Sequence, residues 1–144
     1  MVSKTFPRSC ACLVLSTCLG LLSTSCLARE IKRIHVDAIK LYDYANDPLV
    51  QRECNNFRPT NHQIKHFFSR AYPVEHYIMS HPRYSPCYAT GSIEFADGHF
   101  GTWKLRSSGA ALLTFNRGDE VTLFYPTNEW NDPFEGMYDD NDED

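Results

Sequence analysis

The stretch from Cys87 to Tyr125 constrains the fold of this chain more than any other. It contains four short runs rich in β-branched and aromatic residues, and turn sequences separate them. Each turn sequence has a glycine in second place: Asp97-Gly98, Ser108-Gly109 and Arg117-Gly118. This succession of strands and tight turns predicts an antiparallel meander of four strands.

Apolar and polar residues alternate along these runs, so one face of the predicted sheet is apolar and the other is mixed. Phe124 is the exception, because it is an aromatic residue on the mixed face. The apolar positions are Ile93, Phe95, Trp103, Leu105, Val121, Leu123 and Tyr125. Such a sheet needs a partner layer on its apolar face to be stable.

Helices are expected before the meander. From Arg29 to Ala45 the apolar residues recur at the spacing of one helical face, although Ile34, Val36 and Ala38 also alternate as in a strand. A second short helix is expected from Pro48 to Cys54. The apolar positions of the first segment are Ile31, Ile34, Ala38, Leu41, Tyr42 and Ala45.

The strongest helix signal starts at Thr60. Thr60 and Gln63 have the spacing of a capping box, and Pro73 limits the helix at its other end. The apolar stripe behind the cap consists of Ile64, Phe67, Phe68 and Ala71.

An edge strand is expected at 76–79. The sequence therefore predicts one α+β domain over 29–138, with N-terminal helices packed on a four-stranded antiparallel β-meander.

The first 28 residues have the order of a secretory signal: Lys4 and Arg8, then an uncharged apolar run, then small residues up to Ala28. The run is too short for a transmembrane helix, which needs about 20 apolar residues. Cleavage after Ala28 would export the domain to the periplasm or the medium. The alternative is lipidation of Cys26, which would tether the protein to a membrane.

Four of the six cysteines lie within this signal, and Cys54 and Cys87 remain. An exported protein meets an oxidising compartment, so these two cysteines are expected to form a disulfide. The bridge closes a loop of about 33 residues and contributes roughly 3 to 4 kcal/mol in the chain-entropy model.

Charge disfavours a nucleic-acid partner. Without the signal the chain keeps 12 Lys and Arg against 18 Asp and Glu, and it lacks the basic clusters that contact phosphates. Five of the acids fall in the last six residues, 139–144, a composition typical of a disordered tail.

Enzymatic residues are sparse. Glu94, His99 and Arg106 on a sheet behind a helix resemble, in architecture alone, the small microbial ribonucleases, and this resemblance implies an acid–base hydrolase as one alternative. A solvent-facing ion pair of Glu94 and Arg106 explains the same residues more simply.

His62 and His66 have a spacing that suits a metal on a helix, but no further ligands accompany them. No metal and no cofactor is expected.

Binding is the preferred function. The candidate anchors are aromatic residues on the mixed face and near the C-terminus: Phe124, Trp130, Phe134 and Tyr138. In its size, signal and acidity the chain resembles small exported proteins of Gram-negative bacteria that act as periplasmic inhibitors or immunity proteins. The resemblance implies a non-enzymatic protein that binds a cationic toxin or a wall hydrolase. A lipid-anchored structural envelope protein is the remaining alternative, and only lipidation of Cys26 would bring membrane contact.

Overall fold

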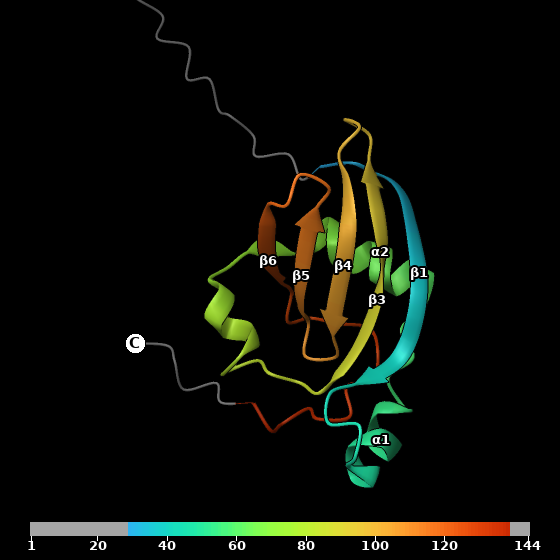
Figure 1. Ribbon diagram of the computed structural model, residues 1–144, viewed down its shortest axis with the longest axis vertical. Coiled ribbons are helices and arrows are strands. Elements are labelled where there is room, and N and C mark those ends of the chain that lie inside the picture. Colours follow the sequence, from blue (N-terminus) through green and yellow to red (C-terminus); the bar gives the residue numbers. More distant parts are fainter. Residues whose placement is uncertain (1–28, 139–144) are drawn as a thin grey trace, which may run out of the picture.

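The computed structural model describes residues 29–138, so the signal, Cys26 and the acidic segment 139–144 lie outside the described residues. Six strands form one antiparallel sheet in the order β1-β3-β4-β5-β6-β2 (Figure 1). The strands are β1 (Ile31–Tyr42), β2 (Tyr72–Pro73), β3 (Cys87–Phe95), β4 (Phe100–Arg106), β5 (Ala110–Phe115) and β6 (Glu120–Phe124). The helices are α1 (Pro48–Cys54), α2 (Asn61–Arg70) and the 3-10 turn η1 (His76–Met79).

The predicted fold class is wrong. The four expected strands exist as β3 to β6, but the sheet has six strands and the molecule is mostly β, with only two short α-helices in its described part. The main error lies at residues 31–42, which form the long edge strand β1 and not a helix. The second error lies at residues 76–79, where a 3-10 turn replaces the expected edge strand.

Irregular pairing explains why β1 resembles a helix in sequence. The register of β1 against β3 shifts between Ile31 and Arg33, and again on either side of Ala38. An extra residue in one strand lets side chains three positions apart face the same side. Ile31 and Ile34 therefore both contact the core, at a spacing that also fits a helix. Lys40, next to the last shift, has a φ of 60°, which is uncommon for a residue with a side chain.

The two predicted helices after β1 are confirmed. Asp47 caps α1 by accepting hydrogen bonds from the amides of Leu49 and Val50. The capping box of α2 is complete, because Thr60 accepts from the Gln63 amide and the Gln63 side chain accepts from the Thr60 amide. Both caps could be predicted from the sequence because each joins residues that are close together in the chain.

One face of the sheet, here called the inner face, is covered by α2, which crosses behind the strands in Figure 1. Phe68 of α2 packs against Trp103 of β4 with ring centroids 5.5 Å apart. The disulfide between Cys54 and Cys87 is present and both residues are fully buried, so it joins the end of α1 to the start of β3. The aromatic side chains of this core are Phe57, Phe67, Phe68, Phe95, Trp103 and Trp130.

The opposite face, here called the outer face, carries the even-numbered residues of β3 and β4. It is covered only in part. Met79 of η1 packs with Ala110 and Phe124 in a second, smaller apolar cluster over β5 and β6. No helix of the described residues lies over the outer face of β1, β3 and β4, and Figure 1 looks directly onto this side of the sheet. Within 29–138 no helix has the length and apolar character needed to cross a membrane.

Candidate functional site

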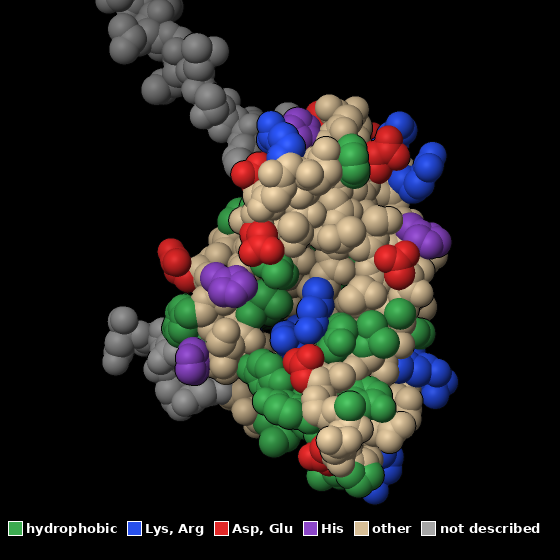
Figure 2. Space-filling view, viewed as in Figure 1, with side chains coloured by type: hydrophobic (Ala, Val, Ile, Leu, Met, Phe, Trp, Pro, Cys, Tyr) green, Lys and Arg blue, Asp and Glu red, His purple; other side chains and the backbone are tan. Residues whose placement is uncertain are grey.

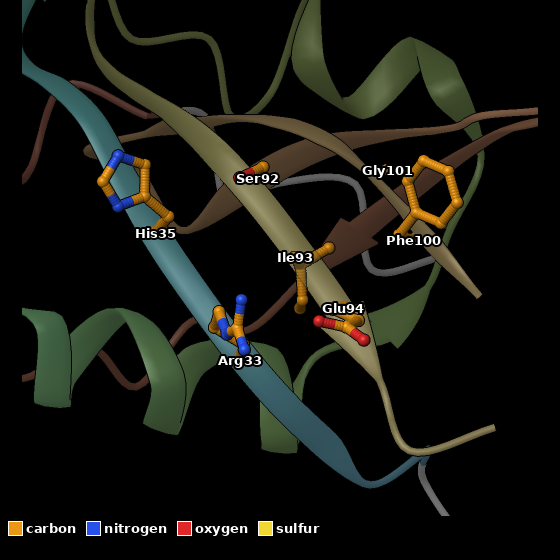
Figure 3. Close-up of a pocket in the computed structure, with 7 residues that line it drawn as sticks. All are labelled: Arg33, His35, Ser92, Ile93, Glu94, Phe100 and Gly101. Atoms are coloured by element: carbon orange, nitrogen blue, oxygen red, sulfur yellow. The ribbon is translucent and has the colours of Figure 1, made fainter. Parts of the chain in front are cut away.

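Two features of the outer face combine charge with access to solvent. The first is a groove of about 350 Å³ over β1, β3 and β4, here called the upper groove (Figure 3). Arg33 of β1 pairs with Glu94 of β3, and the ring of Phe100, 51% exposed, lies on β4 across from them. The remaining lining residues are His35, Ser92, Ile93 and Gly101.

The second feature is a cluster at the other end of β3 and β4, here called the charged cluster. It consists of Asp43, Tyr84, Tyr88, Lys104 and Arg106. The Asp43 carboxylate accepts hydrogen bonds from Lys104 Nζ at 3.3 Å, from Arg106 Nη1 at 2.8 Å and from the Tyr84 hydroxyl at 3.1 Å. Figure 2 shows basic side chains near the centre of this face, with an acidic side chain below them and hydrophobic side chains on both sides.

Aromatic rings hold the two cations of the charged cluster. Lys104 Nζ lies 3.7 Å from the centroid of the Tyr88 ring, and the Arg106 guanidinium carbon lies 4.8 Å from that of Tyr84. Arg106 Nη1 also donates to the carbonyl of Ser85. Cation–π contacts of this kind fix the direction of long side chains that would otherwise move freely.

The electrostatics of the charged cluster keep it ionised. Burial acts to raise the pKa of Asp43, but the hydrogen bond and charge of Arg106 and the charge of Lys104 outweigh it, so this pKa lies below its usual value. Burial and hydrogen bonds to Tyr44 and Asp43 raise the pKa of Tyr84. At neutral pH the Asp43 carboxyl is therefore ionised and the Tyr84 hydroxyl keeps its proton.

The structure does not bring the three candidate catalytic residues together. Glu94 pairs with Phe100, whereas Arg106 pairs with Tyr88, which lies six residues before Glu94 in β3. At the rise of an extended strand this separates Glu94 and Arg106 by about 20 Å. His99 lies in the β3–β4 turn, where its ring packs edge-on against Phe115 of the inner core. No acid–base pair forms among them.

Glu94 is also unsuited to act as a general acid. Its carboxylate contacts Lys32 Nζ at 2.6 Å, and the hydrogen bond and charge of Lys32 lower the pKa of Glu94. The expected ion pair of Glu94 with Arg106 is wrong, because each has a different partner: Lys32 for Glu94 and Asp43 for Arg106. Glu94 and Arg106 therefore each form an ion pair, but not with each other.

The predicted aromatic anchors are mostly packed against the core. Phe124 does lie on the outer face, but only 7% of it is exposed. Trp130 is buried between Phe57 and Phe67 and donates from Nε1 to the carbonyl of Ser107 at 2.8 Å. Phe134 is half-buried against the inner core. These side chains hold the C-terminal segment on the sheet and leave little surface for a partner.

Tyr138 has a polar environment. Its hydroxyl donates to Asp132 Oδ2 at 2.6 Å, and burial together with this hydrogen bond raises the pKa of Tyr138. Asp132 Oδ1 in turn accepts from Ser107, whose hydroxyl lies 2.6 Å from that of Ser85. Both serines are fully buried, so this network fastens the C-terminal segment to the end of β4.

The candidate metal pair does not form a site. His66 Nδ1 lies 3.9 Å from a Glu129 carboxylate oxygen and its ring packs edge-on against Tyr125, while His62 is exposed on α2. Across residues 29–138 no three His, Cys, Asp or Glu side chains are grouped so as to hold a metal ion.

Sequence reasoning missed the charged cluster. Lys104 and Arg106 alternate on one strand, and this spacing alone indicates that they share a face. Asp43 could not be assigned to them, because it lies more than 60 residues earlier and reaches them only through the irregular strand β1.

The chain matches no protein-family model, and it has no significant match among curated proteins or solved structures.

Proposed function

We propose that this protein is an exported, non-enzymatic binding protein, and that it docks a protein partner on the outer face of its sheet. A periplasmic or secreted inhibitor or immunity protein against a toxin or wall hydrolase is the type that fits best. The disulfide is compatible with an oxidising compartment. The expected preference for a cationic partner comes from segment 139–144, because residues 29–138 hold 12 basic and 13 acidic side chains.

The observation that carries the proposal is the composition of the open part of the outer face. Tyrosine and arginine dominate the energetics of protein interfaces. Tyr84, Tyr88 and Arg106 stand together at one end of this face, and the half-exposed ring of Phe100 stands at the other. All of them except Tyr84 project from paired strands, which hold side chains more firmly than loops do.

The position of the candidate acids and bases supports binding over hydrolysis. Glu94 and Arg106 lie at opposite ends of the face and His99 packs toward the inner core. General acid–base catalysis needs such groups within hydrogen-bond reach of one substrate. Glu94→Gln and His99→Ala are therefore expected to leave any background hydrolysis of RNA or peptidoglycan unchanged.

Site-specific photo-crosslinking tests the docking surface. A photoreactive phenylalanine analogue at Phe100 reports on the outer face, and the same analogue at the exposed Lys65 of α2 reports on the other side of the molecule. The proposal predicts a discrete crosslinked protein from position 100 and none from position 65, in extracts from the native host. Equal crosslinking from both positions, or crosslinking only from position 65, would contradict it.

A further inference from the structure

The upper groove has an arginine without a close partner on one of its walls. Arg33 of β1 lies directly opposite Glu94 of β3, and Figure 3 shows the Glu94 carboxylate directed toward it. The close contact of that carboxylate is nevertheless made by Lys32, whose Nζ lies 2.6 Å away. Within residues 29–138 the guanidinium of Arg33 forms no ion pair and no hydrogen bond. Its N–H donors are therefore free to bind a ligand.

One positive charge on this wall is not neutralised. The hydrogen bond and charge of Lys32 lower the pKa of Glu94, and the charge of Arg33 adds to this effect, so two cations share one carboxylate. Asp37, the nearest other acid of β1, lies 3.4 Å from His35. The excess of one charge matches a carboxylate better than a phosphate group, which brings about 1.5 to 2 negative charges.

The opposite wall of the upper groove is aromatic. Arg33, Glu94 and Phe100 occupy one row across β1, β3 and β4, and two strand spacings place the ends of this row about 10 Å apart. Figure 3 shows the Phe100 ring on the far side of β3 from Arg33. Ser92 lies between these walls, and its hydroxyl forms no hydrogen bond within the described part of the chain.

This arrangement favours a carboxylate that is attached to an apolar group. A guanidinium binds a carboxylate through two parallel N–H···O bonds, and a serine hydroxyl can donate a third. An aromatic ring such as Phe100 packs against a second ring or an aliphatic chain. The volume of about 350 Å³ lies at the lower end of the range for ligand pockets, so the groove suits side chains and not a large ligand.

We propose that the upper groove is a carboxylate-binding site, and that an acidic side chain of the protein partner, next to an apolar one, occupies it. Arg33 binds the carboxylate, Ser92 donates a hydrogen bond and Phe100 contacts the apolar neighbour. The occupant rests on the proposed function, whereas the carboxylate site does not. A partner with a net positive charge can still present one acidic side chain to this groove.

Nuclear magnetic resonance titration with hydrocinnamate tests the site without a partner. This probe carries a carboxylate and a phenyl ring, joined by two methylene groups. We expect saturable shifts of the Arg33, Ser92 and Gly101 amide resonances, while the Arg52 amide on α1 stays in place. The uncharged amide of the same acid should bind about tenfold more weakly, because hydrogen bonds between charged groups are stronger. Absence of a saturable shift, or equal binding of the two probes, would overturn the inference.

Substitutions assign the two walls. Arg33→Gln should weaken hydrocinnamate binding about tenfold, and Phe100→Ala should reduce it to the level of acetate, which has no ring. Arg52→Gln is the matched control, since this arginine is 72% exposed on α1, and it should leave the binding unchanged. Hydrocinnamate binding that survives Arg33→Gln would contradict the assignment of the carboxylate to Arg33.

Crosslinking from position 100 then separates the two proposals. In extracts from the native host, Arg33→Gln should lower the yield of the crosslinked protein about tenfold, and Arg52→Gln should not change it. Hydrocinnamate binding without any crosslinked protein would overturn the proposed docking and leave the carboxylate site intact. A crosslinked protein whose yield does not respond to Arg33→Gln would leave the docking intact and overturn the occupant inferred here.

Discussion

The two faces of the sheet differ in what their side chains do. The inner face is filled by large apolar residues, crossed by α2 and closed by the disulfide. The outer face of β1, β3 and β4 carries charged, hydroxyl and tyrosine side chains, and no helix within 29–138 covers them. Core residues are constrained by packing, and exposed residues on a rigid scaffold are free to serve recognition. We therefore attribute stability chiefly to the inner face, and the proposed binding surface is the outer face.

The largest difference between the faces is expected from phenylalanine truncation. Phe67→Ala removes a ring that is 1% exposed in the inner core, and should lower the free energy of unfolding by about 3 to 5 kcal/mol. Phe100→Ala removes a half-exposed ring of the outer face and should change it by less than about 0.5 kcal/mol. Urea denaturation of both variants measures the contrast. Similar losses of unfolding free energy in the two variants would contradict the expected difference between the faces.

The disulfide belongs to the inner face, and its removal is the next largest effect. Replacing both Cys54 and Cys87 by alanine should cost about 3 to 4 kcal/mol, chiefly because the unfolded chain gains freedom. Denaturant unfolding of the double variant under non-reducing conditions gives the value. A loss below about 1 kcal/mol would mean that the bridge adds little to the packing around it.

Gly91 tests how closely the inner face is packed. A Cβ atom there would lie 2.1 Å from the carbonyl oxygen of His35 and 2.3 Å from the Trp103 ring. Gly91→Ala should therefore cost about 1 to 3 kcal/mol. Gly118→Ala is the matched control, since its Cβ would meet no atom within 4 Å and only the positive φ of 92° opposes it, at about 1 kcal/mol. Thermal unfolding of both variants compares steric clash with backbone strain.

Much of the inner face could be predicted from sequence, because its signals are local. The strands β3 to β6, the capping box of α2 and the Cys54 to Cys87 bridge each follow from residues close together or from elimination. The outer face could not be predicted in the same way. Its charged cluster forms because Asp43 contacts Arg106, and this contact depends on the irregular register of β1. From its periodicity alone, the sequence of β1 predicts a helix.

The charged cluster should give a pH-dependent contribution. The folded state lowers the pKa of Asp43, so its carboxylate stabilises the fold above the unfolded pKa of about 4, and this contribution is lost as the pH falls through the folded pKa. Asp43→Asn should cost about 1 to 2 kcal/mol at pH 6 and progressively less below pH 4. Urea midpoints across this range measure the difference. A cost that does not depend on pH would argue against the ion pairs as its source.

Asp119→Asn is the matched control for that titration. Asp119 pairs with Arg117 at an exposed turn, with the two side chains 67% exposed. Exposed pairs of this kind contribute at most about 1 kcal/mol and usually less. The control should therefore leave the unfolding free energy nearly unchanged at every pH.

The most direct measurement of the division between the faces is partner capture by two matched variants. Thr102 is exposed on the outer face of β4 and Ser69 is exposed on α2, and each is replaced by glutamate. Both variants should keep the native unfolding free energy. We predict that Thr102→Glu loses the protein that crosslinks at position 100, and that Ser69→Glu retains it. Loss by Ser69→Glu with retention by Thr102→Glu would place recognition away from the outer face and contradict the account.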